Sequence, residues 1–306
     1  MAGVHTALMS VAELGAEISR RVGRTIPHDG YLLVGLDPVT GAGCFLASRH
    51  AYSAEARQRL EIEEAQAGPS PWRSPRPVLA LGPGAAVRHG RRVREIMAAE
   101  GIGAALRIAV RWGELVLLRE SGFSAAEADQ AERLVGPLAD TVRRFVTSRP
   151  LSPVRHRPPG VLVVDSHDTI TSATSTGREA LRALVTDGDL VGPIRNIIHL
   201  ARRGPALSRV PTSSGWLALH GERLDGGDVA VTIQAAAGAV LLPAVAAWYG
   251  ITPGERAVVE QALEGLPGKQ IARKLHLSPH TVNDHFKAVY RKTGVHSREE
   301  LLAGLG

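Results

Sequence analysis

The sequence predicts an α+β multidomain chain in which two α/β units precede an all-α unit of four helices. Its 306 residues are enough for two or three domains with substantial cores. Short strand-like runs separated by turn residues recur as far as Gln234. Residues 251–306 instead show helical periodicity, and a helix start signal precedes nearly every apolar stretch.

The first α/β unit is expected over residues 1–148. A turn of Asp37-Pro38-Val39-Thr40-Gly41 joins two strands, and a second hairpin surrounds Arg111-Trp112-Gly113. Ser124 and Glu127 form a capping box before the last helix. The expected strands are 31–36, 44–48, 78–82, 104–110 and 114–118, and the expected helices are 6–22, 53–67, 91–100 and 124–147.

A linker over 149–159 is expected next, because this stretch is rich in proline and arginine. The second unit, 160–238, has the order strand-strand-helix-helix-strand-strand-strand. The expected strands are 160–165, 169–172, 206–210, 216–224 and 228–234, and the expected helices are 175–185 and 193–203. A connector helix over 239–250 is expected to transmit movement to the last domain.

Residues 251–306 contain the clearest local signals of the chain. Thr252 and Glu255 form a capping box, as do Ser297 and Glu300. Ser278 caps a helix whose first residue is proline. The tight turn before that helix, His276-Leu277-Ser278, makes this pair of helices a helix-turn-helix.

This segment resembles the DNA-binding domain of LuxR-type (GerE-type) bacterial transcription regulators in one ungapped register. The matching residues are Thr252, Glu255, Val258, Gly265, Lys269, Ile271, Ala272, Leu275, Ser278, Thr281, Val282, His285, Lys292, Gly294, Val295, Arg298 and Leu301. The departures are Gly254, Pro267, Gly268, Gln270 and Thr293, none of which removes a helix. The alternative is an ordinary small helical bundle.

The upstream units also resemble known families, on weaker grounds. Residues 1–148 are similar to a GAF domain in element order and in the final hairpin and helix, while residues 160–238 resemble a reduced PAS domain. GAF domains sense small molecules or serve as dimerisation scaffolds, and both roles stay open here. No cofactor is expected, and an unknown small-molecule effector remains open.

The helix over 279–293 is expected to contact DNA. One face carries Val282, Phe286, Val289 and Tyr290, and the opposite face carries His280, Asn283, Asp284, Lys287 and Arg291. The resemblance implies that Asn283, Asp284 and Lys287 read bases, and His280 lies on the same face. It further implies phosphate contacts at Lys269, Thr281 and Lys292, to which we add Arg291.

The side-chain chemistry fits two of these roles directly. Asn283 can bind adenine through two hydrogen bonds, and Lys287 can reach guanine acceptors. Asp284 has two open interpretations: it accepts from a cytosine amino group and rejects other sequences, or it pairs with Lys287 or His280. His285 is expected to bridge helices.

Charge and composition are consistent with an anionic partner. The net charge is +6 with an isoelectric point near 10, and all four lysines lie in residues 251–306. A single cysteine, Cys44, excludes an internal disulfide. We find no signal peptide and no apolar run long enough to cross a bilayer, so a cytoplasmic bacterial protein with no membrane partner is expected.

Enzymatic interpretations fit less well. Asp165-Ser166-His167-Asp168 contains triad residue types, but four consecutive residues cannot converge as a triad does, so a turn is expected. His199 and His220 as haem ligands form a weaker alternative. The sequence therefore predicts a sequence-specific transcription regulator that binds double-stranded DNA as a homodimer. The helices 6–22, 124–147 and 297–305 are the expected dimer surfaces. RNA polymerase is a further partner left open, and the alternative function is a scaffold that recruits a protein.

Overall fold

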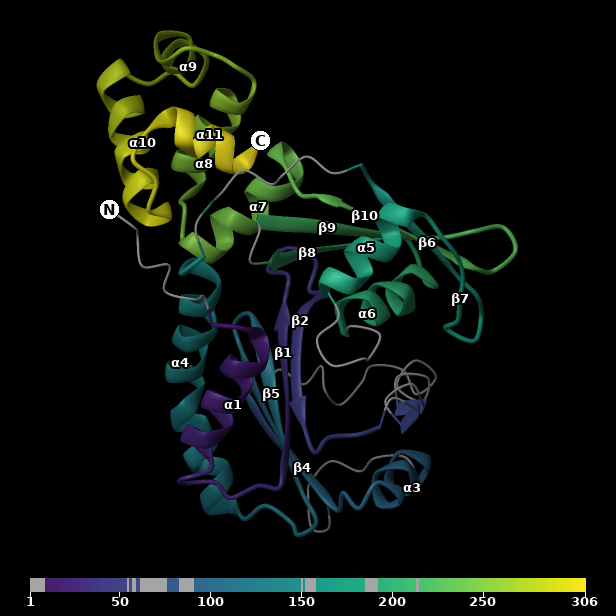
Figure 1. The fold of residues 1–306 in the computed structure, drawn as a ribbon. Helices are drawn as coiled ribbons and strands as arrows, with labels where there is room; N and C mark the ends of the chain where they lie inside the picture. Colours follow the sequence, from purple (N-terminus) through teal and green to yellow (C-terminus); the bar gives the residue numbers. More distant parts are fainter. Residues whose placement is uncertain are drawn as a thin grey trace, which may run out of the picture. The chain divides into compact units, whose positions relative to one another are not determined.

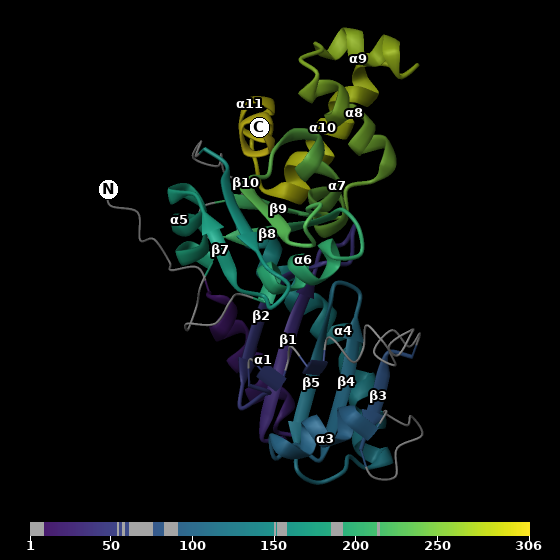
Figure 2. The ribbon, with the colours of Figure 1, turned by 90° about the vertical axis from the view of Figure 1, so that its right-hand side faces the viewer.

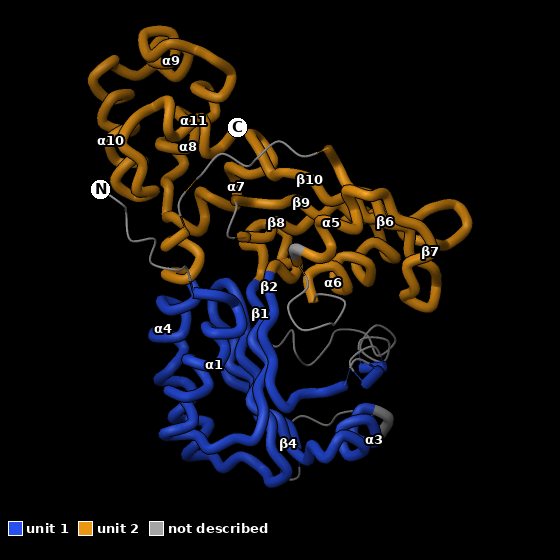
Figure 3. Tube along the Cα trace, in the orientation of Figure 1, with its two compact units in different colours: residues 1–35, 45–142 blue, residues 36–44, 143–306 orange. Residues whose placement is uncertain are grey.

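The computed structural model describes residues 9–53, 55–56, 59–60, 76–82, 91–149, 151, 158–184, 192–212 and 215–306. The chain separates into two compact units (Figure 3), residues 1–35 with 45–142 and residues 36–44 with 143–306. Most of the expected helix 53–67, of the proline-rich stretch 69–77 and of the linker 149–159 lies outside the described residues.

The first unit contains a five-stranded sheet in the order β2-β1-β5-β4-β3, which Figure 2 shows strand by strand. Its elements are α1 (Val11–Val22), β1 (Gly30–Leu36), β2 (Gly43–Arg49), β3 (Val78–Leu81), α3 (Arg91–Ala99), β4 (Ala104–Val110), β5 (Gly113–Arg119) and α4 (Ala125–Thr147). The pairs β1–β5, β5–β4 and β4–β3 are antiparallel. Helix α1 begins at Val11, later than expected, because Ser10 and Glu13 form its capping box.

Helices cover both faces of this sheet. Helices α1 and α4 lie on one face and α3 on the other (Figure 1). A Cβ atom at Gly15 in α1 would lie 2.6 Å from the Cβ of Ala47 and 2.8 Å from the ring of Tyr31, so only glycine allows this close approach. The face toward α3 forms its own core, which includes Leu79, Ile96, Met97, Ala105, Val116 and Leu118.

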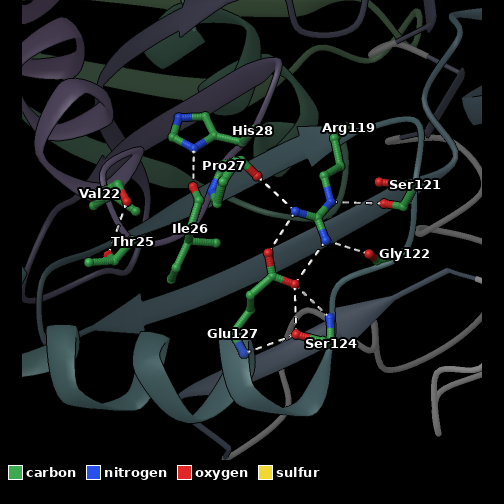
Figure 4. Close-up of polar contacts among 10 residues, drawn as sticks. All are labelled: Val22, Thr25, Ile26, Pro27, His28, Arg119, Ser121, Gly122, Ser124 and Glu127. Carbon is green, nitrogen blue, oxygen red and sulfur yellow. Dashed lines mark hydrogen bonds and ion pairs between the residues drawn. The ribbon is translucent and has the colours of Figure 1, made fainter.

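Arg119, the last residue of β5, joins the sheet to the start of α4 (Figure 4). Its guanidinium donates to both carboxylate oxygens of Glu127, at 2.7 and 2.9 Å, and to the carbonyls of Pro27 at 2.9 Å and Ser121 at 3.0 Å. The bonds from Arg119, helped by Ser124 and opposed by burial, lower the pKa of Glu127 from 4.5 to about 2. The expected capping box at Ser124 and Glu127 is present.

The second unit contains an antiparallel sheet in the order β7-β6-β10-β9-β8. Its elements are β6 (Gly160–Val164), β7 (Ile170–Ala173), α5 (Ser175–Leu184), α6 (Gly192–Ala201), β8 (Ala206–Thr212), β9 (Gly215–Arg223) and β10 (Val229–Ala235). The expected element order is confirmed. Numbered from the start of each unit, the strands of the two sheets have the same order. One core contains Leu162, Val164, Ile194, Ile197, Leu219, Val231 and Ile233.

Residues 36–44, which contain the turn between β1 and β2 and the adjoining ends of both strands, belong to the second unit. The backbone amide of Gly43 donates to Asn196 in α6 at 2.8 Å, and Ser208 in β8 donates to the carbonyl of Gly43 at 2.8 Å. Arg209 in β8 forms an ion pair with Asp37 at 2.8 Å, and their side chains are 5% and 0% exposed. The turn residue Asp37 is therefore also one half of a buried charge pair.

Helix α7 (Gly238–Tyr249) forms where the connector helix was expected, with Pro243 inside it. It is apolar and largely buried, including Leu241, Leu242, Ala244, Val245 and Trp248. Four helices follow: α8 (Pro253–Leu263), α9 (Gly268–Lys274), α10 (Pro279–Thr293) and α11 (Arg298–Leu305). The expected all-α ending of the α+β chain is confirmed.

Candidate nucleic-acid interface

Local capping sets the helix starts of the C-terminal domain. Thr252 and Glu255 form the expected capping box, and Ser278 accepts from the amide of Thr281. At the fourth helix Ser297 caps Glu300 as expected, but the Glu300 carboxylate accepts from the amide of His296 instead of Ser297. His276 completes the turn between α9 and α10 with a φ of 54°, a left-handed conformation that is uncommon for residues other than glycine.

A small core orients α10 against the other helices. Val282, Phe286 and Val289 are buried along one side of it, together with Val258 and Ile271 from α8 and α9. Because these residues recur every three or four positions, the opposite side of α10 must face solvent. The helix can thus present a polar face without disturbing the core.

The polar face of α10 is exposed as the sequence predicts. Asn283 and Arg291 are exposed, and the side chains of His280, Asp284 and Lys287 are 80%, 56% and 66% exposed. An exposed helix of this width and polarity has the form that enters a major groove.

Asp284 lies between two polar side chains on this face. Its carboxylate is 3.1 Å from Nδ1 of His280, one turn before it, and 3.9 Å from Nζ of Lys287. All three side chains are more than half exposed, so these pairs contribute little to stability. The pairing interpretation of Asp284 therefore has a geometric basis, and the base-reading interpretation is compatible with its exposure.

The residues predicted to contact phosphate are not equally available. Lys269 is exposed in α9, and within the described residues it forms no ion pair. Thr281 is half-buried, and its hydroxyl lies 2.9 Å from that of Ser278. Nζ of Lys292 donates to both oxygens of Glu255, at 2.9 and 2.6 Å.

The pair of Glu255 and Lys292 ties α8 to the end of α10. Although burial raises the pKa of Glu255, its bonds from Lys292 and Thr252 outweigh this and leave the pKa below its usual value. Sequence reasoning missed this role of Glu255, although both residues belong to the matched family positions. Lys292 can still reach a phosphate only by sharing or leaving this carboxylate.

His285 lies against α8. A Cβ atom at Gly254 would be 3.4 Å from Cε1 of the His285 ring, and the histidine is half-buried. Gly254, one of the departures from the family pattern, lies beside this ring, and a Cβ atom there would make an ordinary van der Waals contact with it. The contact is consistent with the structural role predicted for His285.

The upstream candidates do not converge on a site. His199 lies in α6, while alternation along β9 places His220 on the sheet face opposite the one that packs against α6. Asp165 accepts from the amides of His167 and Thr169 in a turn between β6 and β7. In the described part of the chain no three potential metal ligands cluster, and no helix is long and apolar enough to cross a membrane.

Solved structures of similar proteins show low overall similarity. SdiA of Escherichia coli aligns over 97% of this chain and 90% of its own at 13% identity, with a TM-score of 0.36. The VqmA–ligand–DNA complex of Vibrio cholerae aligns over 48% and 80% at 18% identity, with a TM-score of 0.23. Scores this low do not establish a shared fold.

The C-terminal segment gives a stronger match. Residues 250–303 match the family model "Bacterial regulatory proteins, luxR family". The HTH-type transcriptional regulators Rv0890c of Mycobacterium tuberculosis and Mb0914c of Mycobacterium bovis are each 47% identical to this chain over 55 residues. That segment is 18% of this chain and 6% of each relative, so the likeness concerns this domain alone. With the capped helices, the left-handed turn and the exposed face of α10, the match identifies residues 250–303 as a LuxR-type helix-turn-helix domain.

Proposed function

We propose that this protein is a sequence-specific transcription regulator that binds double-stranded DNA through α10. The observation that carries the proposal is the exposed polar face of α10 within a LuxR-type domain. Asn283 and Lys287 have the hydrogen-bonding groups to read adenine and guanine. The carboxylate of Asp284 repels a phosphate or a base edge that offers only hydrogen-bond acceptors. Lys269 and Arg291, both exposed, would contact phosphates.

Selection of bound sequences from genomic fragments, followed by gel shifts, tests the reading of bases. Asn283→Ala is expected to weaken binding to the selected site by about 1–3 kcal/mol and to change binding to random DNA little, because phosphate contacts carry no sequence information. Equal losses on both DNAs would show that Asn283 does not read bases.

The phosphate contacts are tested by the salt dependence of binding. Lys269→Ala is expected to reduce the slope of log affinity against log salt by about 0.9, the amount associated with one phosphate contact. Lys274→Ala is the matched control, because this exposed lysine is 2.8 Å from Glu264 and lies off the α10 face. If both variants keep the wild-type slope, Lys269 does not contact DNA.

We further propose a homodimer that places one α10 in each of two half-sites about 10 base pairs apart or a multiple of that. A signal sensed in the upstream units would control it in the bacterial cytoplasm, and RNA polymerase is the partner through which transcription would change. Sedimentation with and without the selected DNA tests the dimer. Binding of a protein partner with no selected DNA sequence would instead support the scaffold function.

A further inference from the structure

Helix α7 has few stabilising side chains of its own. No side chain caps its first turn, and its last turn carries no basic residue. Pro243 lies inside it and cannot donate a backbone hydrogen bond. The next helix, α8, has by contrast a complete capping box at Thr252 and Glu255. We therefore looked for groups outside α7 that hold its ends.

An arginine from elsewhere in the chain binds α7 near each end. Arg209 of β8 donates from Nε to the carbonyl of Val240 in the first turn. Arg143 of α4 donates from Nε to the carbonyl of Trp248 at 3.0 Å. The last four carbonyls of a helix have no partner within it, and this end of a helix attracts cations. Arg143 thus supplies the cation that the last turn of α7 lacks.

A second hydrogen bond holds the end of α7 to the same segment. The hydroxyl of Tyr249 donates to the carbonyl of Arg149, two residues after α4 ends, at 3.1 Å. The tyrosine is 2% exposed, and burial raises its pKa to about 12. The hydroxyl therefore stays protonated and able to donate at any physiological pH.

The residues that bind α7 belong to two anchoring segments, residues 36–44 and 143–149, that continue along the chain into the first unit. Arg209 pairs with Asp37, which directly follows β1. Arg143 lies in α4, all of whose preceding residues belong to the first unit. A change in the first unit thus has two routes along the chain to α7.

At its other side α7 leads almost directly into the DNA-binding domain. Gly250 ends α7 with a φ of 69° and Thr252 caps α8, so only the buried Ile251 separates the two caps. Glu255 in the first turn of α8 then binds Lys292 near the end of α10. A junction this short and buried leaves α8 little freedom to move independently of α7.

We infer that Arg209 and Arg143, with Tyr249, couple the first unit to DNA binding by holding α7 at both ends. They are positioning residues, which act on α10 through α7 and α8. The inference rests on the proposed function, because it concerns how the α10 site is regulated. Coupling is reciprocal, so DNA bound at α10 must in turn act on the two anchoring segments.

Hydrogen exchange of the full chain, with and without the selected DNA, measures this coupling without knowledge of the signal. In the wild type, DNA is expected to slow amide exchange at least about fivefold in both anchoring segments, the lower end of typical coupling. The edge strand β7 contains neither anchoring segment and is the internal reference. It should respond clearly less, because DNA that merely stabilised the whole unit would slow all its amides alike.

Two double variants separate the two routes. Arg143→Met with Tyr249→Phe is expected to remove most of the response of residues 143–149 and to leave that of residues 36–44. Asp37→Asn with Arg209→Met, which removes both members of a buried charge pair, should do the reverse.

Two single variants complete the design. Arg143→Lys keeps a cationic donor and should preserve part of the response of residues 143–149. Arg133→Met changes an exposed arginine of α4 that bonds to Gln130 in the same helix, and it should leave both responses unchanged.

The inference is overturned if DNA leaves both anchoring segments unchanged, if β7 slows equally, or if neither double variant alters the response of its own segment. Should one double variant not fold, the other decides the outcome. The amides of α10 report separately on the proposed function. If DNA fails to slow them, DNA binding by α10 is wrong, whereas slowing of α10 without the anchoring segments refutes the coupling alone.

Discussion

The two sheets share a strand order, and each buries an arginine. The two arginines differ in how many of their buried guanidinium donors have a hydrogen-bond partner. Arg209 in β8 binds both oxygens of Asp37, at 3.1 and 2.8 Å, and the carbonyl of Val240. Arg107 in β4 binds one oxygen of Glu114, and its Nη1 has no partner among the described residues. A guanidinium whose buried donors are paired is expected to contribute more to stability than one that leaves a buried donor unpaired.

The largest effect is expected from Asp37→Asn. The amide keeps the shape of Asp37 and can still accept from the amides of Val39 and Thr40, but it leaves the charge of Arg209 buried and unpaired. We expect a loss of about 3–5 kcal/mol of unfolding free energy, measured by urea denaturation. Adding Arg209→Met should recover much of it, and a loss below 1 kcal/mol in the single variant would contradict the structural role of this pair.

An intermediate effect is expected at Glu127. Because its folded pKa is lowered from 4.5 to about 2, it stabilises the protein above pH 4.5, and this stability is lost as the pH falls toward 2. Glu127→Gln should cost about 2 kcal/mol at pH 7, less than the pKa shift alone implies because solvent screens the pair. Urea midpoints at pH 7, 4 and 3 should fall less steeply in the variant, and parallel curves would show that Glu127 is not the titrating group.

A smaller effect on stability is expected from Arg107→Met. The variant removes an unsatisfied donor along with the ion pair, and Glu114, 23% exposed, can turn to water. We expect a cost of about 1 kcal/mol in urea denaturation. A cost equal to that of Asp37→Asn would remove the contrast between the two arginines.

The smallest effect is expected at an exposed pair. Lys274 and Glu264 are 2.8 Å apart, but their side chains are 53% and 54% exposed. Glu264→Gln should change the unfolding free energy by at most about 0.5 kcal/mol, because solvated pairs contribute little. A larger loss would mean that the contributions of the ion pairs to the unfolding free energy do not follow the burial of their side chains.

The sequence predicted the C-terminal domain in most of its detail because its signals are local. The caps at Thr252 and Ser278 act within three residues, and the apolar stripe of α10 repeats every three or four. The same periodicity correctly placed His280, Asn283 and Lys287 on an exposed face. It could not show that the ammonium of Lys292 is held by Glu255, 37 residues away.

The upstream units show more clearly the difference between features that local signals predict and contacts between residues far apart in the sequence. Alternation and turn residues, read from the sequence alone, determined the strands and their order along the chain, because both act over a few neighbouring residues. Only the tertiary structure brought Asp37 to Arg209 across 172 positions, and only the pairing of β4 with β3 and β5 seated Arg107 among apolar side chains. Which charges are buried, and which donors remain free, follows from how the strands assemble, since burial and pairing are properties of the packed sheet.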